Sequence, residues 1–167
     1  MARENPFTEM KLKAPKIIDL PPKQIIYVAL TGAYGTLNYD EAYAKLWAFV
    51  KENKLFTAGI EAICISHDAP NVTESDKQRS DICLTVHKPA KPFGEVGVKE
   101  IEGGKYAVFA YRGSYDHLSD VYDTIFDKWL TESGYELRNT FTFEKYLNDC
   151  RKTSPEKLKT EIYIPVK

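Results

Sequence analysis

Cysteine is scarce in this chain, and its few cysteines are not arranged as a structural framework. The sequence contains three of them, Cys64, Cys83 and Cys150. Their number is odd and no two of them form a CxxC pair. The sequence therefore predicts neither a set of disulfides nor a cysteine-based zinc site.

Long apolar runs are also missing. No stretch approaches the ~20 apolar residues that a helix needs to span a bilayer. Residues 1–10 lack the apolar core of a signal peptide. We therefore expect a cytoplasmic protein with no membrane partner.

Metal, cofactor and nucleophile motifs are absent as well. The three histidines, His67, His87 and His117, do not form an HExxH pair. The chain has no P-loop, no G-x-S-x-G elbow and no dinucleotide fingerprint. A formal net charge of -1 gives no global attraction to nucleic acid or to anionic membranes. We expect no metal and no cofactor, and whether the protein is an enzyme stays open.

The remaining composition is that of a soluble globular protein. A length of 167 residues, with 43% hydrophobic and 28% charged residues, fits a single domain over residues 1–167. Tyrosine is abundant, with eleven tyrosines beside eight phenylalanines and two tryptophans. This surplus suits a pocket that holds flat ligands and offers a few hydroxyl groups.

The chain repeats itself at a nearly constant offset. Residues 17–20 resemble residues 98–101, and Gly32-Ala33-Tyr34 resembles Gly113-Ser114-Tyr115. Both pairs are 81 positions apart, since 98 − 17 and 113 − 32 give the same number. The repetition predicts two modules, residues 16–88 and 97–167, related by a pseudo-twofold axis.

Each module has the pattern of one helix among extended runs. Residues 61–66 and 81–86 in the first module match residues 141–146 and 161–166 in the second. The apolar stripes at helical spacing are Tyr43, Leu46, Trp47 and Val50, and then Leu118, Val121, Tyr122, Ile125, Phe126 and Trp129. Helices alternate too rarely with strands for a parallel sheet. The pattern therefore predicts an α+β fold of strand–helix–strand–strand modules, with about eight antiparallel strands and two main helices around a central cleft.

Glu144 is the odd residue in this pattern. Strand side chains alternate between two faces, and we expect Ile63, Ile65 and Phe143 to face the helices. This places Cys64 in one module and Glu144 in the other on the face away from the helices. A carboxylate there is costly without a partner, and its pKa would rise in a dry pocket. We predict that Glu144 anchors a ligand; the alternative is a partly exposed glutamate on an edge strand.

A series of short segments follows in order through the second module. They are Gly104-Lys105-Tyr106-Ala107-Val108-Phe109, Tyr111-Arg112-Gly113-Ser114-Tyr115, Phe143-Glu144-Lys145-Tyr146 and Thr160-Glu161-Ile162-Tyr163-Ile164-Pro165-Val166. Together with Leu20-Pro21-Pro22 in the first module, their order and spacing resemble the GyrI-like, or AraC-type effector-binding, family. The resemblance covers nearly the whole chain.

The resemblance implies a cleft that binds hydrophobic, often cationic, multi-ring compounds. In the family pattern Glu144 is the charged anchor, and Tyr146, Tyr163, Tyr115 and Trp129 are candidates for the aromatic lining. Trp129 also belongs to a helix stripe, which favours a place in the core.

The resemblance also has a departure that bears on DNA. Family members often carry a helix-turn-helix ahead of this domain, and about fifteen residues precede Ile17 here. This is too few for such a domain, so we expect a stand-alone small-molecule-binding protein without direct DNA binding.

Two further functions stay open beside the binding of a small hydrophobic or cationic ligand. Some GyrI-like proteins hydrolyse reactive cyclic compounds, and Glu144 with neighbouring tyrosine hydroxyls has the chemistry to activate water. A protein-interaction module of the gyrase-inhibitor kind is the other alternative. Exposed strand edges also leave a homodimer open.

Overall fold

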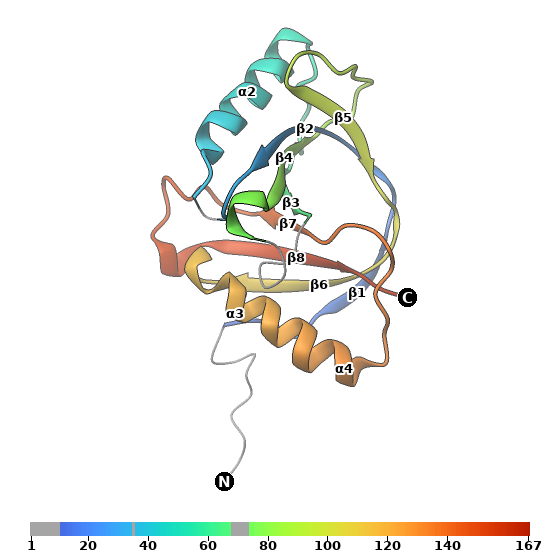
Figure 1. The fold of residues 1–167 in the computed structure, drawn as a ribbon. Helices are drawn as coiled ribbons and strands as arrows, with labels where there is room; N and C mark the ends of the chain where they lie inside the picture. Colours follow the sequence, from blue (N-terminus) through green and yellow to red (C-terminus); the bar gives the residue numbers. More distant parts are fainter. Residues whose placement is uncertain (1–10, 35, 68–73) are drawn as a thin grey trace.

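Eight strands form one antiparallel sheet in the computed structural model, which describes residues 11–34, 36–67 and 74–167 (Figure 1). The strands are β1 (Lys16–Leu20), β2 (Lys23–Thr31), β3 (Ala62–Ser66), β4 (Arg79–Thr85), β5 (Val96–Ile101), β6 (Gly104–Arg112), β7 (Phe143–Tyr146) and β8 (Lys159–Pro165). The predicted α+β fold is confirmed. Residues 1–10, for which the absence of a signal peptide was predicted, lie outside the described residues.

The order of strands across the sheet is β1-β6-β8-β7-β3-β4-β2-β5. The central pair is β7 and β3, and the two outer strands are β1 and β5. The first strand of each predicted module therefore pairs with a strand of the other module: β1 lies beside β6, and β5 lies beside β2.

Helix α2 (Tyr39–Glu52) has a clear start and a clear end. The side-chain oxygen of Asn38 accepts a 3.1 Å hydrogen bond from the backbone N–H of Glu41 and caps the first turn. At the other end, the N–H of Lys54 donates to the carbonyl of Lys51, and the N–H of Leu55 donates to the carbonyl of Val50. These two bonds form a Schellman motif, which ends the helix.

The second helical region runs from α3 (Leu118–Asp123) through a π-helical segment, η3 (Thr124–Trp129), into α4 (Leu130–Ser133). Gly134 ends it with φ 78, in the left-handed region that glycine favours. Short 3-10 turns lie at η1 (Ser75–Lys77), η2 (Tyr115–His117) and η4 (Pro155–Lys157). None of the helices in the described residues is long and apolar enough to cross a membrane.

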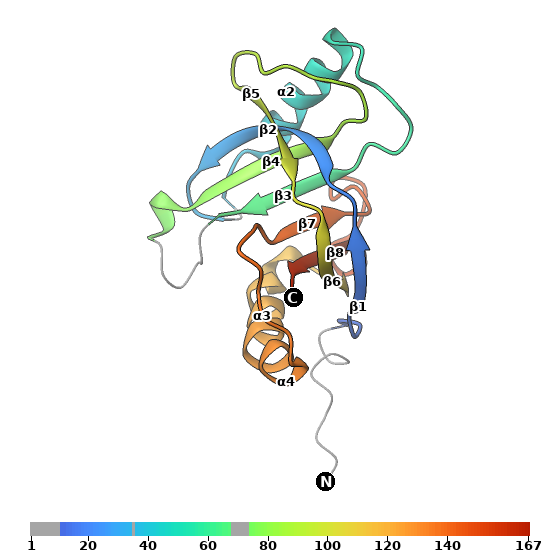
Figure 2. The ribbon, with the colours of Figure 1, turned by 90° about the vertical axis from the view of Figure 1, so that its right-hand side faces the viewer.

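Both helical regions pack on the same face of the sheet, one over each half (Figures 1 and 2). Leu46 of α2 packs in a cluster with Ile82 of β4, and Ile125 of the second helix packs in a cluster with Ile162 of β8. The opposite face carries a third buried cluster, whose members include Ile63, Ile65, Tyr106, Phe143 and Tyr163. The central strands are therefore buried on both faces.

The pairing of the strands corrects the predicted side of Glu144. Glu144 lies opposite Cys64 on one neighbouring strand and opposite Ile162 on the other. Residues directly opposite one another in adjacent strands point to the same side of a sheet. Glu144 and Cys64 therefore face the helices, and Ile63 faces away from them; the prediction was wrong. Alternation shows which residues share a face, but it cannot tell which face the helices cover when both faces are apolar.

Candidate ligand-binding site

Glu144 is buried in the central strand β7, with 7% of its surface exposed. The hydroxyl of Tyr122 donates a 2.6 Å hydrogen bond to Oε1, and the hydroxyl of Tyr146 donates a 2.8 Å hydrogen bond to Oε2. Burial raises the pKa of Glu144 above its ordinary value, although both hydroxyl donors act to lower it. The carboxylate is thus held by neutral donors in a dry environment.

A comparison with the other buried carboxylate makes this arrangement stand out. Asp81 is 3% exposed and lies on the opposite face of the sheet, where His67 Nε2 is 2.6 Å from Oδ2 and Lys99 forms an ion pair with the same oxygen. Within residues 11–34, 36–67 and 74–167, none of the ion pairs includes Glu144. Asp81 therefore has cationic partners, whereas the hydrogen-bond partners of Glu144 are the neutral hydroxyls of Tyr122 and Tyr146.

Four tyrosines surround Glu144. Besides Tyr122 and Tyr146, they are Tyr115, whose ring centroid is 5.6 Å from that of Tyr146, and Tyr43, whose hydroxyl donates to the carbonyl of Ile63 at 3.3 Å. Burial raises the pKa of all four, and the negative charge of Glu144 adds to the effect in each. All four tyrosines are partly exposed residues, and they lie around a carboxylate that is itself buried.

Separate elements bring these groups together. Tyr43 comes from α2, Tyr122 from α3 and Tyr115 from the turn η2, whereas Glu144 and Tyr146 are two positions apart on β7. Residues two positions apart on a strand point to the same face. The cluster therefore lies between the two helices, over the centre of the sheet.

The position opposite Glu144 on the neighbouring strand β3 carries no carboxylate. Cys64 lies directly across from Glu144 and is 6% exposed. Burial raises the pKa of its thiol, and the charge of Glu144 adds to this rise. The thiol is therefore neutral and carries no second charge into the cluster.

Two of the predicted lining residues lie beside Glu144 and two do not. Tyr146 and Tyr115 belong to the cluster. Tyr163 is on the opposite face, where its ring stacks on Phe143 at 4.5 Å. Trp129 packs into the core, with its ring 5.1 Å from that of Phe109. The prediction for Tyr163 was wrong because it assigned Tyr163 and Glu144 to the same face of the sheet, whereas they lie on opposite faces.

Sequence reasoning missed Tyr43 and Tyr122 as members of the cluster. Both were assigned only to apolar helix stripes. A signal was present, because each stripe carries a tyrosine at the corresponding position, 79 residues apart (122 − 43). A tyrosine hydroxyl on an otherwise apolar stripe needs a polar partner when it is buried.

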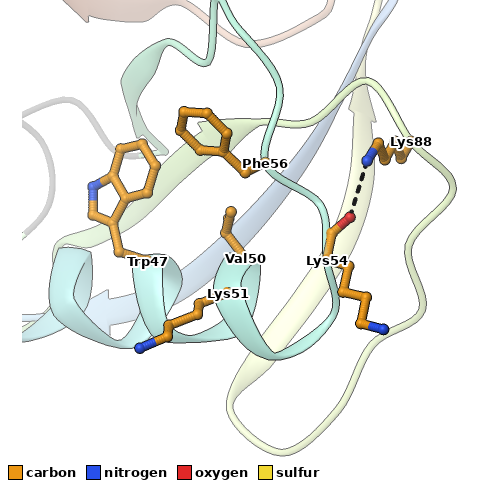
Figure 3. Close-up of a pocket in the computed structure, with 6 residues that line it drawn as sticks. All are labelled: Trp47, Val50, Lys51, Lys54, Phe56 and Lys88. Atoms are coloured by element: carbon orange, nitrogen blue, oxygen red, sulfur yellow. Dashed lines mark hydrogen bonds between the residues drawn. The ribbon is translucent and has the colours of Figure 1, made fainter.

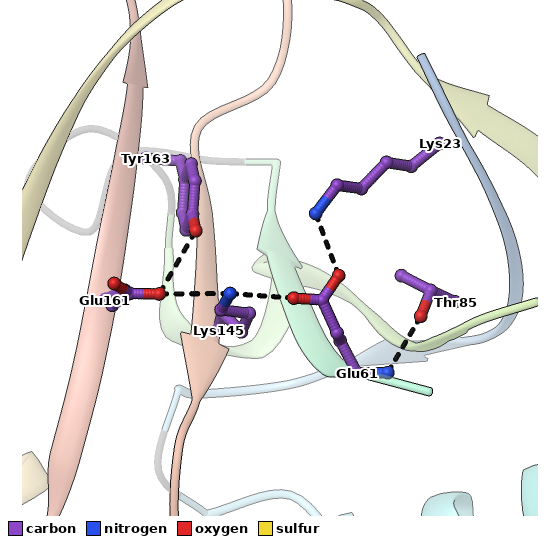
Figure 4. A network of polar contacts seen from close by, with 6 residues as sticks. All are labelled: Lys23, Glu61, Thr85, Lys145, Glu161 and Tyr163. Atoms are coloured by element: carbon purple, nitrogen blue, oxygen red, sulfur yellow. Dashed lines mark hydrogen bonds and ion pairs between the residues drawn. The ribbon is translucent and has the colours of Figure 1, made fainter. Parts of the chain in front are cut away.

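The side chains around Tyr163 form a closed network of charges instead of an open site (Figure 4). Lys145 donates to Glu61 at 2.7 Å and pairs with Glu161 at 3.1 Å, while Lys23 donates to Glu61 at 2.8 Å. Burial opposes the charge of Lys145, but its hydrogen bonds to the two glutamates outweigh burial and raise its pKa. Positive and negative charges offset one another here, so the network ties strands together and leaves no charge for a ligand.

Comparison with known families assigns nearly the whole chain. The family of the GyrI-like small molecule binding domain matches residues 13–167. The chain belongs to this family. The resemblance that the sequence segments indicated is therefore confirmed.

Relatives of this GyrI-like chain have regulatory and inhibitory names. It is 29% identical over 153 residues to the probable transcriptional regulator YgiV of Escherichia coli (strain K12), covering 90% of this chain and 94% of YgiV. It is 27% identical over 144 residues to a DNA gyrase inhibitor of Yersinia enterocolitica, covering 81% of this chain and 87% of the inhibitor.

Solved structures share the fold of the GyrI-like chain. It covers 96% of the C-terminal domain of EcmrR with a TM-score of 0.69 and 19% identity, using 92% of its own length. It spans 58% of the EcmrR chain in a complex with DNA, using 95% of its own length, with a TM-score of 0.72 and 18% identity. SAV2435 bound to tetraphenylphosphonium aligns with a TM-score of 0.57 and 19% identity, over 93% of this chain and 94% of SAV2435.

Proposed function

We propose that this protein binds an amphipathic organic cation between α2 and α3, with the positive charge at Glu144 and the apolar groups against the surrounding tyrosines. The observation that carries the proposal is a buried carboxylate that has two hydroxyl donors and no cation among the described residues. A ligand cation would offset the cost of burying that charge.

The tyrosines suit the same class of ligand. Tyr43, Tyr115, Tyr122 and Tyr146 present ring surfaces beside the carboxylate, and aromatic rings attract cations as well as apolar groups. Their raised pKa values keep the hydroxyls neutral at pH 7, so they supply donors without adding charge. The tetraphenylphosphonium bound to SAV2435, a protein of the same fold, is a cation of this kind.

Calorimetric titration with tetraphenylphosphonium tests the proposal, with the neutral triphenylphosphine oxide as the matched compound. We expect the cation to bind the wild-type protein and Glu144→Gln to weaken binding at least about 30-fold. Glu161→Gln, which removes a carboxylate from the opposite face, is the control and should keep wild-type affinity. Equal affinities of the wild type and Glu144→Gln for the cation would refute the role of Glu144.

The pH dependence of binding gives a second readout. The pKa of Glu144 is raised by burial, so part of the population is protonated at mildly acidic pH. The affinity for tetraphenylphosphonium should rise with pH until the carboxylate is fully ionised. In Glu144→Gln the affinity should not change over the same range.

A hydrolytic function would use the same residues. Glu144 could take a proton from water, and Tyr122 and Tyr146 could donate to a developing oxyanion. Both carboxylate oxygens already accept hydroxyl hydrogen bonds, which favours charge recognition over proton abstraction. Mass spectrometry of a bound reactive cyclic compound after long incubation separates the two, because an enzyme would convert it and a binding protein would return it unchanged.

The relatives named DNA gyrase inhibitors suggest another candidate function, inhibition of DNA gyrase. A supercoiling assay with purified gyrase tests it directly. Inhibition that persists in Glu144→Gln would assign this activity to a surface other than the tyrosine cluster.

A further inference from the structure

A groove of about 480 Å³ lies at the C-terminal end of α2 and shares no lining residue with the tyrosine cluster. Its lining residues are Trp47, Val50, Lys51, Lys54, Phe56 and Lys88 (Figure 3). Three are apolar and three are lysines, so the groove is both hydrophobic and positively charged.

The apolar part consists of two exposed aromatic side chains beside a buried aliphatic one. Trp47 is 42% exposed and Phe56 is 67% exposed, whereas Val50 is 2% exposed. The helical pattern predicted Trp47 as part of the apolar stripe, and its ring is nevertheless accessible. Exposed aromatic residues that gather in one hollow are typical of interaction surfaces.

The charged part is unusual because its lysines have no carboxylate partners. Lys45, on the same helix, pairs with Glu41 at 3.2 Å and with Glu95 at 2.7 Å. Within the described ranges, none of the ion pairs includes Lys51, Lys54 or Lys88. A chain of net charge -1 therefore presents three unpaired cations around one apolar hollow.

The backbone at Lys54 strengthens the argument. Lys54 has φ 54, in the left-handed region, at the Schellman position where glycine is the favoured residue. A lysine here strains the backbone, and it places a cation at the rim of the groove. The ammonium of Lys88 donates to the backbone carbonyl of Lys54 at 3.2 Å, which holds a second cation against the turn that ends α2 (Figure 3).

We propose that this groove binds an acidic, amphipathic segment of a partner protein. A large apolar side chain of the segment lies against Trp47, Phe56 and the floor at Val50, and flanking Asp or Glu residues pair with Lys51 and Lys54. The concave shape favours a peptide side chain over a lipid surface, because a flat bilayer would not reach the floor. The inference is independent of ligand binding at Glu144.

Peptide selection tests the inference. Random twelve-residue peptides displayed on phage are first passed over the Trp47→Ser/Phe56→Ser double variant, which removes peptides that bind elsewhere on the protein. The remaining phage are then selected for binding to the wild-type protein. We expect enriched peptides with a bulky apolar residue flanked by Asp or Glu. A labelled synthetic peptide should bind in a salt-dependent manner, and Lys51→Glu should weaken it about tenfold.

Lys54→Gly is the most informative variant, because it removes a cation while relieving the strained backbone. It should melt at or above the wild-type temperature and still bind the peptide several-fold more weakly, which excludes unfolding as the cause. Glu144→Gln should bind the peptide like the wild type.

Any one of four results would overturn the inference. One is enrichment of peptides without acidic residues, or equal affinity in Lys51→Glu. Another is co-sedimentation with anionic lipid vesicles that depends on Trp47, which would assign the groove to membranes. The last is a dimer in analytical ultracentrifugation that Trp47→Ser abolishes, which would assign it to a second copy of this chain.

Discussion

The hydroxyl of Tyr122 on α3 donates a 2.6 Å hydrogen bond to Oε1 of Glu144 on the central strand β7. This contact couples the position of a helix to the ionisation of a buried carboxylate. Tyr146 holds the other oxygen from the same strand. Both oxygens of the carboxylate are therefore held in a fixed orientation, which the proposed ligand would meet between the helices.

Removal of this hydroxyl should destabilise the protein measurably. We expect Tyr122→Phe to lower the free energy of unfolding at pH 7 by about 1.5–3 kcal/mol, the range for a hydrogen bond to a charged group. The same change should raise the pKa of Glu144 further, because the hydroxyl lowers it in the wild type. Urea unfolding measures the effect. Tyr135→Phe, which removes a hydroxyl remote from any carboxylate contact among the described residues, should cost less; equal costs would contradict the coupling.

The contribution of Glu144 to the stability of the protein should depend on pH and should fall as the pH rises. The pKa of Glu144 is raised in the folded state above its ordinary value of 4.5. Below that value the group is protonated in both states. As the pH rises from about 4.5 through the folded pKa, the unfolded chain ionises more readily, so the contribution of Glu144 to stability falls.

Glu144→Gln isolates this contribution, because other groups titrate equally in both proteins. The difference in unfolding free energy between Glu144→Gln and the wild type should grow in favour of the variant as the pH rises above 4.5. Denaturant unfolding at pH 4, 5, 6 and 7 provides the measurement. A difference that stays constant with pH would mean that the carboxylate is not desolvated.

Period-two alternation and helical stripes predicted the strands, the helices and their order along the chain. They could not assign the face of β7, because both faces of the central strands are covered. Ile63 and Ile65 looked like residues under a helix, yet they belong to the cluster on the far side. The pairing of the strands, which alternation does not encode, decides the side on which Glu144 lies: Glu144 is opposite Ile162, and its neighbour Cys64 is opposite Ile82.

The candidate site shows the same limit. Glu144 and Tyr146 share a strand, so their neighbourhood follows from spacing alone. Tyr43 and Tyr122 lie near the carboxylate only because two helices pack on the sheet. Local sequence patterns do not predict how closely a helix residue approaches a strand residue. The sequence does show that these two tyrosines occupy corresponding positions in the two helical stripes.

The three thiols should differ in reactivity. Cys64 and Cys83 are buried and Cys150 is exposed. Burial raises the pKa of both buried thiols, so they contain little of the thiolate that reacts. Alkylation of the native protein, followed by mass spectrometry, should modify Cys150 quickly and the other two only after denaturation. Cys150→Ser should remove the fast reaction; fast labelling of Cys64 would show that the floor of the cluster opens in solution.

Substitutions on the two faces of the sheet should differ in their effects on ligand binding. Tyr146 donates to Glu144, whereas the hydroxyl of Tyr163 donates to Glu161 at 3.1 Å within the charge network on the other face. The two changes are chemically identical and lie on neighbouring strands. We expect Tyr146→Phe to alter the affinity for tetraphenylphosphonium several-fold, because it changes both the orientation and the pKa of the carboxylate. Tyr163→Phe should leave the affinity at the wild-type value and lower stability by about 0.5–1.5 kcal/mol, less than Tyr122→Phe, because this hydrogen bond is longer and Glu161 is partly exposed. A weakened affinity in Tyr163→Phe, with Tyr146→Phe unchanged, would move the binding site to the face away from the helices.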